Sequence, residues 1–376
     1  DLHRVDRRQR QMCIRDSVNL IQRASGIVDK LYVVVSYSDD KDLETFSNSR
    51  FIKEITPKDR LRFIKQTFKN QKNIHSFLFD ESSCPPFPEG WEQWSSLLKK
   101  EIEVREPDVI WEDEILFISN RHEDKDYNLK YFGSQTKSID PEYLEYNVNS
   151  IEIRKNPSKY WNFLPREVRE HLIPLITICG GESSGKSVMV DKLANVFNTS
   201  SAWEYGREYV FEKLGGDEDS LQYSDYEKIV FGHQTNVLYA ARNANKFALI
   251  DTDYIATLAF CLTYEKRDNP IVREFVNNYR FDLTILLENN VKWVSDGLRS
   301  IGQEERRMNF QNLLKKLYAE YNIPYITVAS NNYEKRYLAC KAIIKAYLDG
   351  ADNSELQKIS DSFNSVSYTH LRAHET

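Results

Sequence analysis

The sequence predicts an α/β protein of two domains, each a parallel sheet covered by helices, and three observations lead to that prediction. Apolar runs of strand length alternate with segments of helical period along the chain. The chain has 376 residues, which is enough for two cores of ordinary size. Residues 180–187 read GGESSGKS, a complete G-x-x-x-x-G-K-[ST] motif. The second domain is therefore expected to bind a nucleoside triphosphate.

Composition narrows the classes of partner. A formal net charge of -6 gives no basic field that would hold a nucleic-acid backbone, so no nucleic-acid partner is expected for this chain. No apolar stretch approaches membrane-spanning length. The five cysteines have no paired or metal-like spacing, and we interpret them as reduced thiols. These features favour a cytoplasmic protein with small-molecule partners, and they leave a homo-oligomer open.

Both ends of the chain lack a periodic apolar pattern. Residues 1–17 are strongly charged and resemble translated adaptor sequence, as do residues 366–376. We therefore expect 1–17 to be non-native and disordered, and the tail 351–376 to be partly non-native. The first domain is expected at 18–168 and the second at 169–350.

The first domain begins, on this interpretation, inside an element at Val18. Helix 18–27 precedes a buried strand at 31–36. Thr56-Pro57-Lys58-Asp59 is a capping box that opens a helix to about residue 69. Further strands are expected at 74–79 and 115–119, in one parallel sheet whose first strand is missing.

The phosphate-binding loop lies between a buried strand containing Ile176 and Ile178 and a helix that continues from Val188. Its glycines allow backbone N–H groups to face phosphate oxygens, and the positive end of the helix lies behind them. Lys186 is expected to reach the β- and γ-phosphates, and Ser187 to hold Mg²⁺. The alternative is a simple Gly/Ser turn. The predicted ATP-binding residues are Gly180, Gly181, Glu182, Ser183, Ser184, Gly185, Lys186 and Ser187.

The rest of the second domain continues the alternation. Ser224 to Glu227 forms a second predicted capping box, opening a helix past residue 240. Strands are expected at 247–253, 283–288 and 325–329. Helices are expected around 313–321 and to about residue 348.

Two carboxylates and an arginine complete the predicted catalytic set. Strand 247–253 ends in Asp251 and Asp253, of which the first is expected to hold Mg²⁺ and the second to accept the proton of an acceptor hydroxyl. Arg299 is expected on a mobile lid, where it would neutralise the transferring phosphoryl. The alternatives are a solvated turn for the carboxylates and, for the neighbouring Arg306 and Arg307, a solvated helix face.

With its motifs in this order, the second domain resembles the ribosylnicotinamide kinase domain of the NadR-type bifunctional proteins. The resemblance runs from about Leu175 to Tyr347 and rests on strings such as FNTSSAWEYGREYVFEKLGGDE, FALIDTD and WVSDGLRSIG. It implies transfer of the γ-phosphoryl of ATP to nicotinamide riboside, with Mg²⁺ as cofactor. A cationic pyridinium suits aromatic faces and carboxylates. The substrate-side candidates are Trp203, Glu204, Tyr205, Arg207 and Trp293.

Two of the residues near this region carry an alternative interpretation. Trp203 could equally be part of the core. His233 lies inside a predicted helix, where a structural histidine is favoured over a catalytic one.

The first domain resembles the adenylyltransferase domain of the same proteins, a nucleotidylyltransferase-like Rossmann domain acting on NMN or NAD. The family's G-x-F-x-P-x-H-x-G-H motif is absent, and its [IV]-S-x-T-x-x-R motif is altered at 148–154, where Asn149 replaces Ser and Arg154 is kept. Trp91 is a candidate nicotinamide platform, with core packing as the alternative. The resemblance makes Trp91, Asn149 and Arg154 the expected ligand residues of this domain.

Three functions are weighed on these grounds. The leading hypothesis is a kinase of NAD salvage with a truncated adenylyltransferase domain. The second is a regulatory protein whose first domain senses NAD or NMN, motivated by the altered motif. The third is a general nucleoside kinase.

Overall fold

The chain divides into two compact units, residues 1–172 and 173–376, each described here by itself. The computed structural model describes residues 14–49, 54–86, 88–119, 123–139, 145, 150–291 and 304–365. The division falls between Leu172 and Ile173, four residues after the expected boundary at 168. No helix among these residues is long and apolar enough to cross a membrane.

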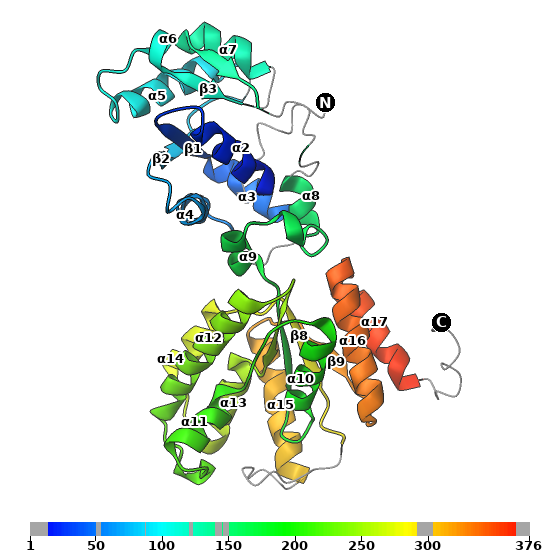
Figure 1. The fold of residues 1–376 in the computed structure, drawn as a ribbon. Helices are drawn as coiled ribbons and strands as arrows, with labels where there is room; N and C mark the ends of the chain where they lie inside the picture. Colours follow the sequence, from blue (N-terminus) through cyan, green and yellow to red (C-terminus); the bar gives the residue numbers. More distant parts are fainter. Residues whose placement is uncertain are drawn as a thin grey trace. The chain divides into compact units, whose positions relative to one another are not determined.

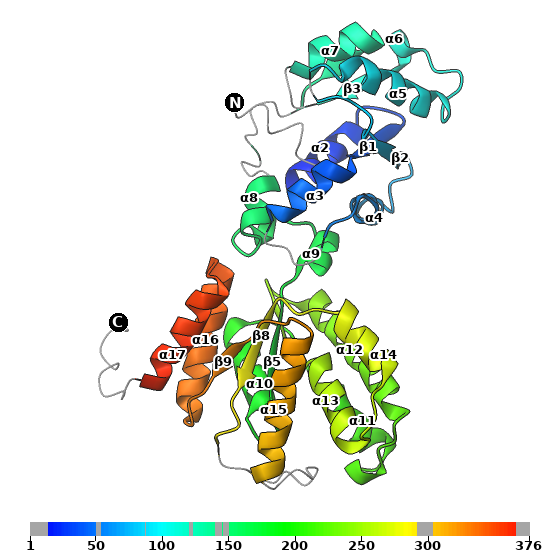
Figure 2. The ribbon, with the colours of Figure 1, turned by 180° about the vertical axis from the view of Figure 1, so that it is seen from behind.

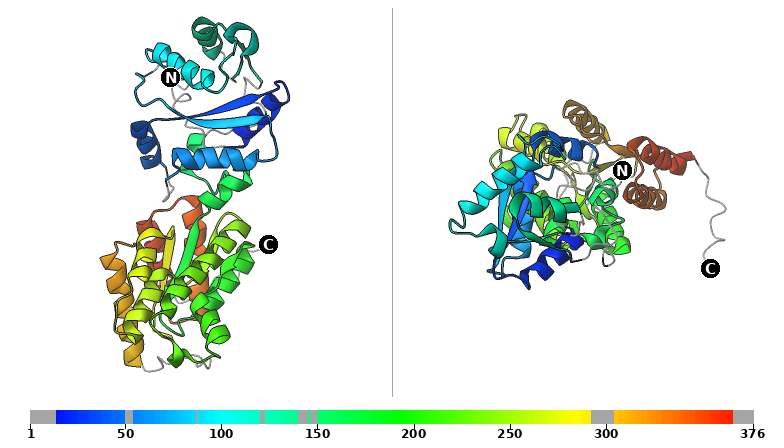
Figure 3. Two further views of the ribbon diagram at one scale, coloured as in Figure 1. Left: turned by 90° about the vertical axis from the view of Figure 1, so that its left-hand side faces the viewer. Right: turned by 90° about the horizontal axis from the view of Figure 1, so that it is seen from above.

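The strands of the first unit form two parallel pairs. β1 (Leu31–Tyr37) pairs with β2 (Ile74–Asp80), beginning with Leu31 opposite Ile74, and the two lie side by side (Figure 3). β3 (Leu116–Ile118) pairs with β4 (Gln135–Lys137). Parallel pairing is confirmed. The expectation of one sheet is wrong for the described residues, since the two pairs are separate, and β4 was not predicted.

Of two helix starts expected in the first unit, the structure confirms one and moves the other. The Thr56 capping box is confirmed, because Thr56 Oγ1 accepts from the backbone N–H of Asp59 at 3.1 Å while the Asp59 carboxylate accepts from that of Thr56. The first helix begins at Arg15 and Ile14 is buried, so residues 14–17 belong to the structure, contrary to expectation, and 1–13 lie outside the described residues. The helices are α2 (Arg15–Ser25), α3 (Asp39–Ser47), α4 (Pro57–Thr67), α5 (Trp91–Glu103), α6 (Trp111–Glu114), α7 (Glu123–Phe132), α8 (Ser150–Lys155), α9 (Arg166–Leu172) and the 3-10 helix η1 (Trp161–Phe163).

A five-stranded parallel sheet is the centre of the second unit (Figures 1 and 2). Its order is β6-β7-β5-β8-β9, and the strands are β5 (Leu175–Gly180), β6 (Ser201–Ala202), β7 (Ala248–Asp251), β8 (Leu283–Leu287) and β9 (Ile326–Val328). The chain leaves β5 for the β6 edge, returns to β7, and then crosses to β8 on the other side of β5. The carboxyl end of β5 is thus a topological switch point, where α/β folds bind ligands.

Helices cover both faces of this sheet. On one face, α10 (Lys186–Phe197), α16 (Tyr333–Asp349) and α17 (Asn353–Ser365) share an apolar core with the strands. The other core joins the sheet to α12 (Asp225–Asn243), α13 (Tyr254–Tyr264), α14 (Pro270–Asn278) and α15 (Glu304–Glu320). Two shorter elements, α11 (Tyr205–Lys213) and the 3-10 helix η2 (Glu218–Ser220), lie between β6 and α12.

Two expectations for the second unit are corrected. Helix α17 packs on α16 and β9, and Leu356 is fully buried, so residues 353–365 belong to the second unit and are not a separate tail; residues 366–376, the part expected to be non-native, lie outside the described residues. The Ser224 capping box does not form, because Ser224 has helical dihedral angles and its side chain makes no cap bond. Asp225 accepts from the backbone of Gln222 instead, at 3.0 Å.

Candidate active site

The phosphate-binding loop joins β5 to α10 and has the conformation that its glycines allow. Gly180 has a φ of +150°, and a Cβ there would come within 2.6 Å of the carbonyl oxygen of Leu287. Gly185 caps α10 with a φ of +90°. Lys186 is buried, and its Nζ donates to the carbonyl oxygen of Gly181 at 3.2 Å, inside the loop. The loop therefore presents backbone N–H groups and one lysine to a phosphate chain.

Buried side chains of α15 and α16 form hydrogen bonds to the backbone of this loop. Arg336 of α16 is fully buried and donates to the carbonyl oxygens of Ser184 at 2.8 Å and Glu288 at 2.6 Å. From α15, Arg307 donates to the carbonyl oxygen of Glu182 at 3.4 Å, and Gln311 accepts from the N–H of Gly181 at 3.1 Å. The sequence did not indicate a role for Arg336. Arg306 is exposed, as expected for a residue on a solvated helix face, whereas Arg307 is buried, so that alternative is wrong for Arg307.

Asp251, at the end of β7, is opposite Ile178 of β5 and thus lies beside the loop. Burial and the charge of Glu204 raise the pKa of its carboxyl to about 6, while Lys186 and a hydrogen bond from Ser187 oppose that shift. Ser187 and Asp251 therefore offer two adjoining oxygen donors beside the loop, which suits a hard cation such as Mg²⁺. No cluster of three or more His, Cys, Asp or Glu suited to a metal occurs in the described part of the chain. A cation here would complete its shell with water and substrate phosphates.

Asp253 has a structural environment that the sequence did not reveal. Its Oδ1 accepts from the N–H of Ala256 at 2.9 Å and so caps α13, and its Oδ2 accepts from the hydroxyl of Tyr318 at 2.8 Å. The residue is buried and does not line the pocket described below. This geometry corrects the expectation that Asp253 points toward an acceptor hydroxyl, because both of its oxygens are used inside the core.

The residue between these carboxylates is strained. Thr252 has a φ of +76°, which is costly for a β-branched residue and is kept only where neighbours enforce it. Its N–H donates to Ile178 at 3.2 Å, and its carbonyl oxygen lies 3.2 Å from Nε2 of His233. Burial lowers the pKa of His233, so the ring is neutral and donates to that carbonyl. This agrees with a structural histidine, which also lines the pocket.

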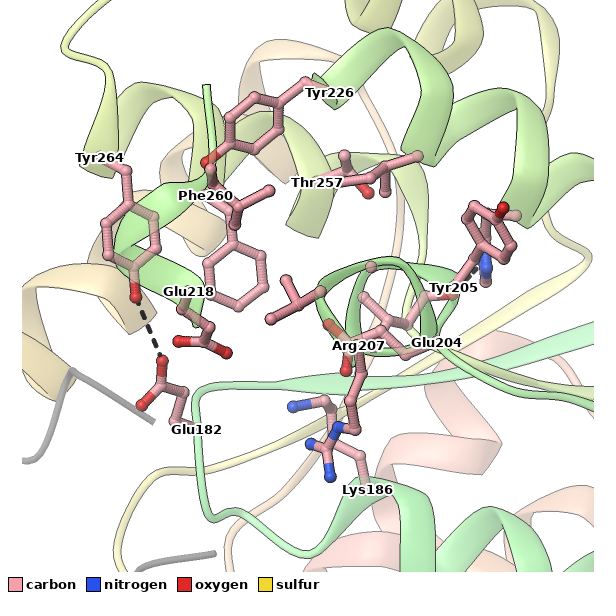
Figure 4. Close-up of a pocket in the computed structure, with 16 residues that line it drawn as sticks. Glu182, Lys186, Glu204, Tyr205, Arg207, Glu218, Tyr226, Thr257, Phe260 and Tyr264 are labelled. Carbon is pink, nitrogen blue, oxygen red and sulfur yellow. Dashed lines mark hydrogen bonds between the residues drawn. The ribbon is translucent and has the colours of Figure 1, made fainter. Parts of the chain in front are cut away.

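A pocket opens directly beside Lys186, among α11, α12 and α13 (Figure 4). It holds about 820 Å³ of empty space, part of it open to solvent. Lys186 and Arg207 lie next to each other at one end, below Glu204 (Figure 4). Predicted residues that the structure brings together here are Glu182, Lys186, Glu204, Tyr205 and Arg207.

The other end of the pocket is aromatic and was not predicted. Phe260 and Tyr264 come from α13, and the hydroxyl of Tyr264 donates to Glu182 of the loop at 3.4 Å. The hydroxyl of Tyr226, on α12, is buried without a hydrogen-bond partner in the described residues. Glu218 adds a carboxylate to the same end. Phe260 and Tyr264 lie on α13 outside any motif, so only their periodicity was visible in the sequence. Glu218 ends the string FNTSSAWEYGREYVFEKLGGDE and Tyr226 lies within Ser224 to Glu227, but neither residue was predicted to bind substrate.

Trp203, another substrate-side candidate, is not brought to the pocket. The Trp203 side chain is 59% exposed, which excludes the core alternative, and it is not among the pocket-lining residues. Trp293 and Arg299 lie outside the described residues.

Two candidates of the first unit, Trp91 and Arg154, are buried. Trp91 is only 6% exposed and stacks on Tyr127, with ring centroids 5.0 Å apart, so core packing describes it and the platform interpretation is corrected. Arg154 is buried on α8, where its Nη1 donates to Ser150 at 3.0 Å. Asn149 lies outside the described residues.

Fold and site together define a two-unit α/β protein whose second unit is a P-loop nucleotide-binding enzyme with an acceptor pocket. A family model described as "AAA domain" matches residues 175–336. Crystal structures of NadR protein with NAD and AMP-PNP, and with NR, align at TM-scores of 0.74 and 0.73. They cover 90% and 89% of this chain and 94% and 92% of theirs, and both are 22% identical, so this likeness concerns the fold.

Sequence comparison gives the family. The chain is 45% identical over 328 residues to the trifunctional NAD biosynthesis/regulator protein NadR of Salmonella typhimurium (strain LT2), covering 87% of this chain and 79% of that protein. It is 44% identical over 330 residues to the protein of the same name from Escherichia coli (strain K12), with the same coverage. The chain belongs to the NadR family.

Proposed function

We infer that the second unit transfers the γ-phosphoryl of ATP to nicotinamide riboside and so forms NMN for NAD synthesis. The observation that carries this proposal is the continuity of one pocket from Lys186 of the phosphate loop to an end lined by aromatic rings and carboxylates. A cationic nicotinamide ring is stabilised by aromatic faces and nearby carboxylates. Membership of a family described by NAD biosynthesis supports the same substrate class.

The chain's own residues have distinct tasks in this transfer. Lys186 and the loop N–H groups stabilise charge on the phosphates. Ser187 and Asp251 would hold Mg²⁺, which supplies charge neutralisation between the β- and γ-phosphates. Glu204 faces the acceptor and orients its hydroxyl, the task that the buried Asp253 cannot perform. Arg299 remains a proposed lid residue, which would neutralise the transferring phosphoryl.

We propose for the first unit a site for NMN or NAD of the adenylyltransferase type, with Asn149 and Arg154 as its ligand residues. The family resemblance supports this, and the altered 148–154 motif favours a sensor that binds such a ligand without turnover. Two measurements distinguish an adenylyltransferase from a sensor: calorimetry with NMN and NAD, and an assay for NAD formation from NMN and ATP. A sensor binds the ligand and forms no NAD. The working compartment of such an ATP-dependent protein is proposed to be the cytoplasm.

The kinase proposal is tested by replacing the loop lysine. Lys186→Ala should lower turnover of nicotinamide riboside by roughly 100-fold or more, because a preorganised charge contact of this kind is worth about 3 to 4 kcal/mol. Lys192→Ala is the matched control, since Lys192 is exposed on the same helix, and it should leave turnover unchanged.

Phosphate transfer is measured with ATP and Mg²⁺ against nicotinamide riboside, uridine and thymidine. Near wild-type turnover of Lys186→Ala contradicts the assignment of the loop. Activity on uridine or thymidine without activity on nicotinamide riboside favours a general nucleoside kinase.

A further inference from the structure

The acceptor pocket fixes the direction in which a nucleotide must lie along the loop. Glu204 follows β6 and Asp251 ends β7, so the acceptor is bound on the β6–β7 side of β5. In phosphoryl transfer the attacking and leaving oxygens are roughly in line, on opposite sides of the transferred phosphorus. The leaving nucleoside diphosphate therefore extends toward the other side of β5, where β8 and β9 lie.

An aromatic side chain lies on that side, against the loop. Tyr333 is the first residue of α16, which follows β9 (Figure 1). Its Cε1 is 3.0 Å from the position that a Cβ on Gly185 would take, so an edge of the ring rests on the loop. The side chain is nevertheless 49% exposed, and no hydrogen bond or ring contact involves it among the described residues. Its ring is thus available to a ligand.

The position of Tyr333 is set before any ligand binds. Asn332 caps α16 by accepting from the N–H of Lys335 at 3.0 Å. One turn into the helix, buried Arg336 ties α16 to Ser184 of the loop and to Glu288 after β8. Because the first turn of α16 is anchored on both sides, its backbone loses little conformational freedom when a ligand stacks on the ring.

We propose that Tyr333 is the platform on which the purine base of the nucleoside triphosphate stacks. The proposal rests on the inferred use of ATP by this loop and adds the subsite for the base. Stacking on an aromatic ring depends on the π-face that every base has, and it carries little discrimination between bases. Tyr333 therefore sets the affinity for ATP and GTP alike.

Binding of three probes separates base from phosphate recognition: AMP-PNP, GMP-PNP and inorganic tripolyphosphate, each measured by calorimetry with Mg²⁺. Tyr333→Ala should weaken AMP-PNP and GMP-PNP by about 10-fold or more and leave tripolyphosphate unchanged. Tyr333→Phe and Tyr333→Trp keep a ring and should bind all three like the wild type. Phe211→Ala removes another exposed aromatic side chain of this unit and is the control.

In steady-state assays, Tyr333→Ala should raise KM for ATP and leave KM for the riboside unchanged. Unchanged AMP-PNP binding in Tyr333→Ala overturns the proposal, as does an equal loss of tripolyphosphate binding, which would assign the effect to the loop. If the wild-type protein binds none of the three probes, the inferred ATP site itself fails.

Discussion

At the scale of single residues, the carboxyl of Asp251 titrates under the influence of Glu204, which lines the adjoining pocket. Burial and the Glu204 charge raise the pKa of Asp251 to about 6, so its ionised form is lost as the pH falls through that value. An ionised Asp251 is needed to hold Mg²⁺. The kcat/KM of the ligand-free enzyme should therefore decline on the acid side near pH 6.

Glu204→Gln tests this coupling. Removing the Glu204 charge should lower the pKa of Asp251, and the acid limb of the kcat/KM profile should move to lower pH by a fraction of a unit. The limb is measured on the activity that the variant retains, and Glu208→Gln, on the exposed side of α11, is the control. A limb that stays in place would show that another group controls it.

The two carboxylates after β7 should respond differently to amide replacement. Asp251→Asn should lose at least about 100-fold in turnover. The pKa of Asp251 is higher in the folded protein, about 6, than in the unfolded chain, near 4. The carboxyl therefore contributes to the free energy of unfolding while it is protonated, below about pH 4, and this contribution is lost as the pH rises through about 6. Asp251→Asn should thus stabilise the ligand-free protein at pH 7.5, by up to about 3 kcal/mol.

Asp253→Asn should keep turnover close to that of the wild type, because an amide oxygen can still cap α13 and the amide nitrogen can donate to Tyr318. Turnover and thermal unfolding at pH 7.5 are measured for both variants. A loss of 100-fold or more in Asp253→Asn would restore its expected role as a base.

At the scale of elements, α17 shows how a segment without a motif becomes part of a core. Leu356 is buried beside Ile343 and Ile344 of α16, and Ser360 donates to the carbonyl oxygen of Thr327 in β9 at 2.6 Å. Gln357 accepts from the N–H of Thr327 at 2.9 Å. Helix α17 therefore covers one edge of the sheet, where it satisfies both backbone groups of a strand residue.

Truncation tests this role. A chain ending at Asp352 should lose the Leu356 contacts, worth about 2 to 5 kcal/mol, and its unfolding midpoint should fall by about 5 °C or more. A chain ending at Ser365 is the control and should unfold like the full chain, since 366–376 have no periodic apolar pattern. Equal midpoints for the two truncations would show that α17 adds no stability.

At the scale of the whole molecule, the two units differ in how much of their secondary structure the apolar pattern of the sequence predicted. The second unit has a continuous five-stranded sheet, and four of its strands, β5, β7, β8 and β9, coincide with apolar runs that the sequence displays, whereas the two-residue β6 was not predicted. In the first unit, β4 (Gln135–Lys137) has three residues, all of them polar, so no apolar period indicated a strand there, and the described strands form two separate pairs.

What the sequence determined by itself was the phosphate loop, the alternation of strands and helices, and the family. These depend on local chemistry: glycines with positive φ, a lysine at fixed spacing, and an apolar run before a helix. Pocket residues such as Glu204 and Arg207 were also within reach, because they belong to a specific string beside β6.

Only the tertiary structure decided which polar side chains are available to a ligand and which are used inside the core. Asp251 and Asp253 are two residues apart and look equivalent, yet Tyr318, 65 residues on, takes an oxygen of the second. For Trp91 and Trp203 the sequence left core packing open as an alternative, and the structure buries the first and exposes the second, since burial depends on which helix packs over each ring. Arg336 reaches the loop across 152 residues. Such contacts join segments that are far apart in the sequence, so they cannot be predicted from the pattern of neighbouring residues.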